Sequence, residues 1–255
     1  MKKIAFLIVM LMMSMVGMAQ ASDASCDSWF EEANAAYLEG DFDQALELYG
    51  RIESAGMASA PLFYNMGNTY YKIKEYPKAI LYYEKALKLD PSNEDIRTNL
   101  EIANLATVDK INELPKSFIY RWWNGLKSAF SADGWAWISI AAFALLLLCL
   151  FAFLMSNRTG LRKVGFFVGL LMVACLALSM VFAIGKMQDL KHQDEAIIMT
   201  PTVTVKSSPT QYSVDLFVLH EGTKVKILDT ANEWNKIKIA DGSVGWLLAE
   251  DMTAF

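Results

Sequence analysis

Two long apolar runs without a single charged residue constrain this chain more than any other feature. They cover residues 136–155 and 164–185, and neither contains Asp, Glu, Lys, Arg or His. Each run has about the 20 residues that a helix needs to cross a hydrocarbon core roughly 30 Å thick. The sequence therefore predicts transmembrane helices at 135–155 and 164–185. The alternative is a buried helical hairpin within a soluble domain.

The connector between the two runs indicates how the predicted helices are arranged. Residues 156–163 allow only a tight turn, so the helices should form an antiparallel hairpin. The connector carries Arg158, Arg162 and Lys163 but no acidic residue, and positive charge in short loops stays on the cytoplasmic side. We therefore expect a cytoplasmic loop, with the flanking segments on the opposite side. Small residues expected where the two helices touch are Gly165, Gly169, Ala174 and Ser179.

The N-terminus indicates export. Lys2 and Lys3 precede an apolar stretch at 4–16, and Ala19 and Ala21 form a cleavage site of the A-x-A type. This pattern predicts a signal peptide at 1–21, and the alternative is an uncleaved anchor. Both readings place the soluble segments in the periplasm of a bacterium, in agreement with the basic connector. The predicted location is the inner membrane, with two spans.

Residues 26–91 repeat with a period of 34. Asn34 corresponds to Asn68, Tyr37 to Tyr71 and Tyr49 to Tyr83, without insertion or deletion. A period of this length is typical of tetratricopeptide arrays, and the second copy resembles the consensus of that family. A third copy has only its first helix, which we interpret as a cap. The sequence therefore predicts an all-α array at 26–112, in which Cys26 is a structural cysteine rather than a lipid attachment site.

Residues 116–130 form a candidate amphipathic helix between the array and the first apolar run. Phe118, Ile119 and Trp122 share one side at 100° per residue, and Arg121 and Lys127 lie on the other. Such a helix directly before a membrane span is expected to lie in the membrane interface, where aromatic residues gather. The alternative is a sixth helix packed on the array.

Residues 196–255 show the alternation and turn signals of short β-strands. The motif at 203–209, then Gly222, Trp234 and Trp246, resembles the bacterial SH3 domain. This resemblance implies a small all-β barrel. Trp234 and Trp246 are candidate anchors of the domain, and we expect at least one of them in its core. The predicted fold class is thus a multidomain membrane protein with an array, a two-helix hairpin and an SH3-like barrel.

The order of these modules resembles the BatE family of the Bacteroides aerotolerance (Bat) operon. The resemblance is carried also by residues 95–100, 108–111 and 118–123, at the joint between the array and the hairpin. It implies protein partners among other Bat membrane proteins, including von Willebrand A-type proteins and a MoxR-type ATPase. It further implies a link to oxygen tolerance.

The resemblance to tetratricopeptide repeats also implies a partner-binding groove lined by the first helix of each repeat. Aromatic rings with neighbouring amides would suit an extended segment or a helix of a protein partner. The alternative is that Tyr64 and Tyr71 only pack against neighbouring helices. Phe30 stands where a peptide-carboxylate clamp has a lysine, so we do not expect a C-terminal carboxylate as ligand. The predicted lining residues are Phe30, Asn34, Tyr37, Tyr64, Asn65, Asn68, Tyr71 and Lys72.

The sequence contains no recognisable catalytic, nucleotide-binding or metal-binding motif. His192 and His220, its only histidines, are expected to be exposed. The net charge of −5 does not indicate a basic surface that would bind nucleic acid. We therefore predict a non-enzymatic scaffold without cofactor or metal, which binds protein partners. The alternatives are an accessory protein that binds or senses peptidoglycan through the SH3-like domain, and an enzyme with an unrecognised site.

Overall fold

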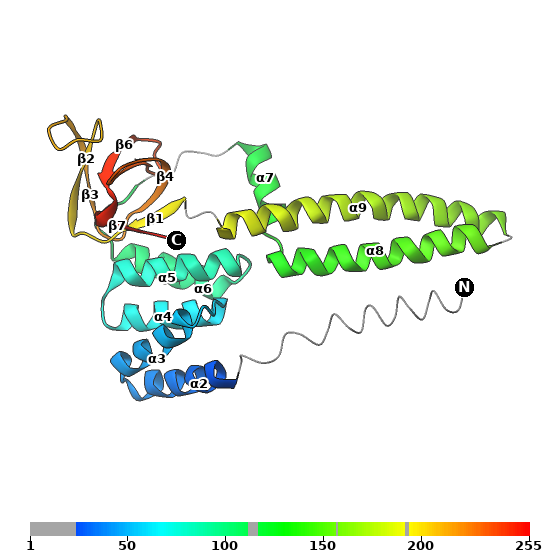
Figure 1. The fold of residues 1–255 in the computed structure, drawn as a ribbon, viewed down its shortest axis with the longest axis horizontal. Coiled ribbons are helices and arrows are strands. Elements are labelled where there is room, and N and C mark those ends of the chain that lie inside the picture. The colour runs from blue at the N-terminus through cyan, green and yellow to red at the C-terminus, as the bar shows by residue number, and fades with distance from the viewer. Residues whose placement is uncertain (1–23, 112–116, 157, 192–193) are drawn as a thin grey trace. The chain divides into compact units, whose positions relative to one another are not determined.

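The computed structural model describes residues 24–111, 117–156, 158–191 and 194–255 (Figure 1). The predicted signal peptide lies outside these residues, as does His192. The chain divides into two compact units, Met1–Ala58 and Ser59–Phe255, which are considered separately below. The fold class expected from the sequence is confirmed: helix pairs of the tetratricopeptide type, two long apolar helices and an antiparallel sheet domain.

The first unit contains one helix pair, and the second unit begins with another pair and a single helix. Local signals explain where these helices begin: the side chains of Asp41, Ser59 and Asn93 accept hydrogen bonds from backbone amides of the first turns. The helices are α2 (Ala24–Glu39), α3 (Phe42–Ser54), α4 (Ala60–Lys72), α5 (Tyr76–Leu89) and α6 (Glu94–Leu105).

Helices α4 and α5 approach each other closely at Gly67. A Cβ atom added there would lie 2.6 Å from the ring of Tyr83, which is only 2% exposed. The glycine therefore provides the space that the tyrosine ring fills, as the repeat pattern predicts for a small residue at this position.

We predict that Gly67→Ala destabilises the α4–α5 pair by about 1–3 kcal/mol, because the buried ring has to move. Gly50→Ala on α3 is the matched control, since nothing lies within 4 Å of an added Cβ at that position. The control should be neutral or slightly stabilising. Hydrogen exchange of the amides of each helix, in detergent-solubilised full-length protein, measures both effects; equal protection in the two variants would contradict the packing role of Gly67.

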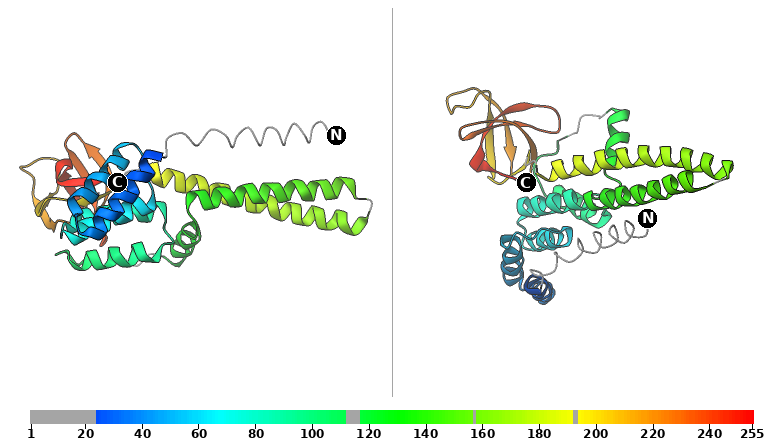
Figure 2. Two further views of the ribbon diagram at one scale, coloured as in Figure 1. Left: turned by 90° about the horizontal axis from the view of Figure 1, so that it is seen from below. Right: turned by 45° about the vertical axis from the view of Figure 1, so that its right-hand side comes forward.

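Helices α8 (Ala132–Met155) and α9 (Thr159–Lys191) are long and apolar enough to cross a membrane. They run side by side as an antiparallel pair in each view (Figures 1 and 2). Large apolar side chains point away from the pair, with Leu148 64% and Phe167 65% exposed. Arg162 lies near the start of α9 rather than in a loop, and it stacks on Phe153 at 5.3 Å.

Small residues bring α8 and α9 together. An added Cβ at Gly165 would lie 2.9 Å from the carbonyl oxygen of Cys149, and Ser139 donates a hydrogen bond of 2.8 Å to Ser179. Gly169 is also buried, whereas Ala174 is exposed rather than packed between the helices, contrary to expectation. Close backbone approach and the interhelical hydrogen bond between Ser139 and Ser179 thus hold the hairpin together.

Helix α7 (Phe118–Lys127) contacts the hairpin through its second half. The ring of Trp123 lies 5.0 Å from that of Phe182, and Lys127 forms an ion pair of 2.6 Å with Asp189. Phe118 and Ile119 are 73% and 77% exposed. An exposed aromatic end beside a candidate span agrees with a position in the membrane interface, which stays a prediction.

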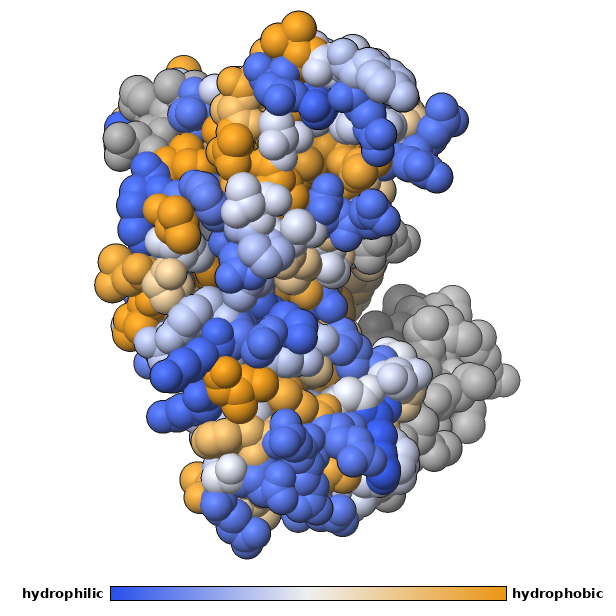
Figure 3. All heavy atoms as spheres, turned by 90° about the vertical axis from the view of Figure 1, so that its left-hand side faces the viewer, coloured by the Kyte–Doolittle hydropathy of each residue, from blue (hydrophilic) through white to orange (hydrophobic). Residues whose placement is uncertain are grey.

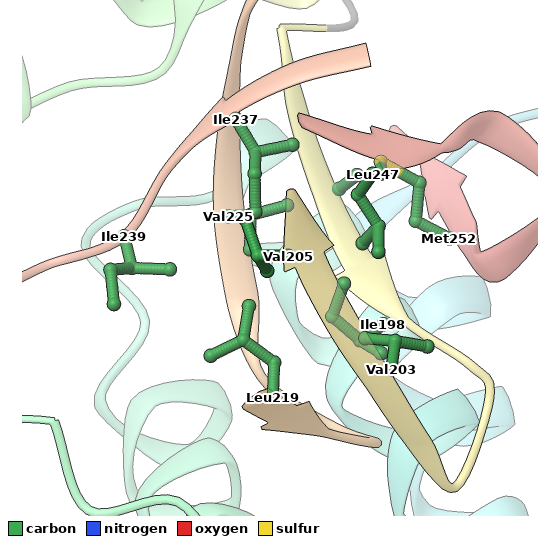
Figure 4. Close-up of a cluster of buried hydrophobic side chains, with 10 residues drawn as sticks. Ile198, Val203, Val205, Leu219, Val225, Ile237, Ile239, Leu247 and Met252 are labelled. Atoms are coloured by element: carbon green, nitrogen blue, oxygen red, sulfur yellow. The ribbon is translucent and has the colours of Figure 1, made fainter. Parts of the chain in front are cut away.

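The sheet domain is a seven-stranded antiparallel sheet with strand order β3-β2-β6-β5-β4-β1-β7. Its core is aliphatic, and the side chains of Val205, Leu219, Val225 and Ile237 converge there (Figure 4). The strands are β1 (Glu195–Ile198), β2 (Thr202–Lys206), β3 (Asp215–His220), β4 (Lys224–Ala231), β5 (Trp234–Lys238), β6 (Val244–Leu248) and β7 (Met252–Ala254), with a 3₁₀ turn at Ala249–Asp251.

The surface of the array and the sheet domain differs from that of the hairpin. On the face that Figure 3 shows, hydrophilic side chains are interspersed with smaller hydrophobic patches. Such a mixed surface is typical of domains in water. The apolar surface of α8 and α9 is instead suited to lipid.

Candidate binding surfaces

The predicted groove residues of the first repeat also make contacts within that repeat. The hydroxyl of Tyr49 donates a hydrogen bond of 2.6 Å to Asn34, and the ring of Phe30 lies 6.0 Å from that of Tyr49. The ring of Tyr37 meets Phe42 edge-on at 5.6 Å. These contacts join α2 to α3 and leave each of the three predicted side chains partly exposed.

The second repeat reproduces each contact 34 residues later. Tyr83 donates a hydrogen bond of 2.8 Å to Asn68, the rings of Tyr64 and Tyr83 lie 6.1 Å apart, and Tyr71 meets Tyr76 at 5.5 Å. Both repeats keep the tyrosine donor and the asparagine acceptor. The polar pair that each helix–helix contact partly buries is therefore hydrogen-bonded in both repeats. The packing alternative for Tyr64 and Tyr71 is therefore supported.

The capping helix α6 joins the same network. The side-chain amide of Asn99 donates to Asn68 at 2.8 Å and to the hydroxyl of Tyr64 at 3.0 Å. Asn68 thus accepts two hydrogen bonds within the fold, which gives it a structural role that the sequence analysis did not predict. Asn65 is partly exposed and Lys72 is exposed on α4. Partner binding by these side chains stays a prediction.

Trp234 and Trp246 are both partly exposed, and neither belongs to the buried aliphatic cluster in which we expected at least one of them. The reason is the two-residue period of a strand: Gly245 and Leu247 point inward on β6, so Trp246 points outward. Trp246 lies directly opposite Lys206 on one side and Lys236 on the other. Directly paired residues share a face of the sheet, so this indole lies between two lysines, of which Lys206 also forms an ion pair with Asp215.

We predict different outcomes for two truncations in this domain. Ile237→Ala removes a fully buried side chain and should destabilise the domain by about 2–5 kcal/mol. Trp246→Ala should cost less, because part of the ring already contacts water. Denaturant unfolding of the full-length protein, followed by hydrogen exchange of the β5 and β6 amides, measures the loss of stability in each variant. A larger loss of stability for Trp246→Ala than for Ile237→Ala would contradict the assigned core.

The sequence analysis did not predict a contact between the segment after α6 and the sheet domain. Asp109 accepts hydrogen bonds from the backbone amide of His220 at 2.7 Å and from the hydroxyl of Thr223 at 2.8 Å. Its second oxygen lies 2.8 Å from Nδ1 of His220. The expectation that His220 is simply exposed is therefore wrong, since its ring is partly buried against this carboxylate.

The environment of Asp109 keeps it ionised. Burial alone would raise its pKa, but the hydrogen bonds from His220 and Thr223 outweigh burial and hold the pKa below the ordinary value of 3.8. A carboxylate with a depressed pKa contributes stability above the pKa of the unfolded chain. This contribution is lost only as the pH falls below that value and through the folded pKa, so the contact persists at neutral pH.

Helix α5 makes a second contact with the sheet domain, at β1 and β4. Lys224 lies 2.8 Å from Glu84 of α5 and 3.1 Å from Glu195. Burial disfavours the charged lysine, but the two carboxylates outweigh it and raise the pKa of Lys224. Lys88 donates to the backbone oxygen of Phe255 at 2.8 Å, and burial lowers the pKa of Lys88. No pattern in the sequence signals the contacts of Glu84 with Lys224 and of Lys88 with Phe255, because each joins segments more than 100 residues apart.

A shallow pocket of about 290 Å³ lies between α5 and the sheet domain. The rings of Tyr70 and Tyr82 stack at its side, 5.3 Å apart. Its lining residues are Tyr70, Glu75, Pro77, Lys78, Leu81, Tyr82, Met199, Glu221 and Thr253. Within the described ranges, no group of three or more His, Cys, Asp or Glu side chains is placed to hold a metal ion.

Comparisons with known proteins identify the two modules. The family model of the tetratricopeptide repeat matches residues 60–93, and that of the bacterial SH3 domain matches residues 201–253. A similar curated protein, the Protein SGT1 homolog of Oryza sativa subsp. japonica, is 35% identical over 75 residues, which are 29% of this chain and 20% of that protein. The chain thus spans about a fifth of that relative. The chain carries a tetratricopeptide repeat and a bacterial SH3 domain, both non-catalytic domain types.

Proposed function

We propose that this chain is a non-enzymatic scaffold, anchored in a bacterial inner membrane, that holds its repeat array and SH3-like domain together on the periplasmic side. Both modules then bind protein partners. The resemblance to the BatE family favours other Bat membrane proteins as those partners, within a complex linked to oxygen tolerance.

The contact between Asp109 and His220 is the observation that carries this proposal. The two residues lie on opposite sides of α8 and α9 in the sequence, yet their side chains meet at 2.8 Å. If α8 and α9 each cross the membrane once, the segments before and after them emerge on the same side. The contact therefore supports an even number of crossings. The basic residues Arg158, Arg162 and Lys163, at the turn and the start of α9, favour the periplasm for both modules.

This topology predicts that protease added to spheroplasts digests both the array and the SH3-like domain, because both face the medium. The basic turn between α8 and α9 should become accessible only after the membrane is permeabilised. Antibodies against the array and against a tag after Phe255 follow the two digestions. A protected SH3-like domain beside a digested array would contradict the two-span arrangement.

The proposed groove predicts site-specific capture of a partner in living cells. A photo-crosslinking residue in place of Lys72, exposed on α4, should form a defined adduct with a membrane protein of the von Willebrand A type. The same residue in place of Glu47, exposed on α3, is the matched control and should give little adduct. Equal capture at both positions, or none at position 72, would contradict the groove assignment.

A second candidate function is peptidoglycan binding by the SH3-like domain. The position of Trp246 between Lys206 and Lys236 favours it, because an indole flanked by cations suits a polymer of sugars and carboxylate-bearing peptides. Sedimentation of the full-length protein with purified peptidoglycan decides between the two. Binding that is lost in Trp246→Ala would establish this function, and protein left in the supernatant would exclude it.

A further inference from the structure

Residues 107–111, here called the strap, connect α6 to the linker before α7 and touch the sheet domain at three points. The methyl carbon of Thr107 lies 2.6 Å from the position that a Cβ atom at Gly222 would occupy. Asp109 accepts hydrogen bonds from His220 and Thr223. Ile111 packs against the hydrophobic core of the domain. The strap therefore offers a methyl group, a carboxylate and an aliphatic side chain, in that order.

The turn between β3 and β4 is shaped to receive these groups. The backbone amide and the ring Nδ1 of His220 and the hydroxyl of Thr223 converge on the carboxylate of Asp109. Each of the three atoms lies within 2.8 Å of a carboxylate oxygen. Gly222 is buried with φ +82°, and any side chain there would collide with Thr107. Thr223 is only 6% exposed. Three converging donors distinguish an ionised carboxylate from an amide or alcohol, which makes this turn selective.

The strap is also bound to the C-terminal end of α6, where backbone carbonyls lack partners within the helix. Lys110 donates to the carbonyl oxygens of Asn104 at 2.8 Å and Leu105 at 3.1 Å, and Thr107 donates to Asn104 at 2.9 Å. These bonds satisfy the end of the helix. The strap thus leaves α6 in a defined direction and presents Asp109 to the turn.

We propose that the β3–β4 turn of the SH3-like domain is a peptide-binding face for a carboxylate followed two residues later by an aliphatic side chain, with the strap as its resident ligand. This inference goes beyond the proposed scaffold function, but it rests on the same contact between Asp109 and His220. Because the strap occupies the face in cis, a partner segment of the same chemistry binds there only by displacing it. Displacement releases the contact between the end of α6 and the sheet domain, while Lys224 and Lys88 still join α5 to that domain.

Hydrogen exchange in the detergent-solubilised full-length protein tests whether the strap protects the turn. Asp109→Ala should accelerate exchange of the His220 amide by about tenfold or more, because its acceptor is lost. Thr223→Val keeps the shape and removes one donor, so it should accelerate exchange by a smaller factor. Glu101→Ala, on the exposed face of α6, is the control and should have no effect. Unchanged exchange at His220 in Asp109→Ala would overturn the proposal.

A synthetic peptide with the strap sequence tests whether the turn is a binding face. The peptide is added at millimolar concentration, on the order of the effective concentration of a tethered segment. It should slow His220 exchange severalfold in the Asp109→Ala protein and leave the wild type unchanged, and the same peptide with Asn in place of Asp should do nothing. No protection, or equal protection by the Asn peptide, would overturn the proposal.

The β5 and β6 amides report in the same experiment whether the domain remains folded. If Asp109→Ala unfolds the domain, the peptide is tested on Thr223→Val instead, where the weakened strap should be partly displaced. Protection of His220 that the Asn peptide reproduces there would again overturn the proposal.

Discussion

The apolar surface of α8 and α9 is the constraint on which the rest of the structure depends. Neither apolar run offers a charge to water, and most of the large side chains point away from the partner helix. Only a lipid phase covers that surface without cost, and a hairpin of two spans returns the chain to the side from which it came. In the proposed two-span arrangement, the soluble modules are tied to one face of the membrane, although the hairpin separates them in the sequence.

The contacts between the second repeat and the SH3-like domain depend on the return of the chain through the hairpin. Asp109 approaches His220, and Glu84 approaches Lys224, across intervals of 111 and 140 residues. Closing so long an interval is entropically unfavourable in an unfolded chain, but a folded hairpin brings its two ends together beforehand. In the proposed arrangement, the hairpin is an anchor and also the element that allows the two modules to pack against each other.

The parts of the fold that repeat or alternate were predictable from the sequence. The 34-residue period located the repeats, the absence of charge located the hairpin, and the alternation in 196–255 located the strands. The same alternation contains the information that Trp246 points outward, since Leu247 beside it is buried. We expected at least one of the two tryptophans in the core, but strand geometry decides which face a residue occupies.

The candidate binding surfaces were less predictable, because they arise from side chains that meet only after folding. Asn68 matched a groove position by spacing, but its bonds to Tyr83 and Asn99 depend on the packing of three helices. Asp109 carried no local signal, although the segment 108–111 contributed to the resemblance noted at the joint. Its partners lie in a turn that follows the hairpin, and no periodic pattern connects the two.

Chemical crosslinking of the full-length protein in intact cells tests the central claim that the second repeat and the SH3-like domain pack together on one side of the membrane. Glu84→Cys with Lys224→Cys places thiols where two side chains now meet at 2.8 Å, after replacement of Cys26, Cys149 and Cys175. A short thiol-specific crosslinker should join this pair efficiently and join Glu84→Cys with Lys238→Cys poorly. Absence of the first crosslink, or equal yields for both pairs, would contradict the account.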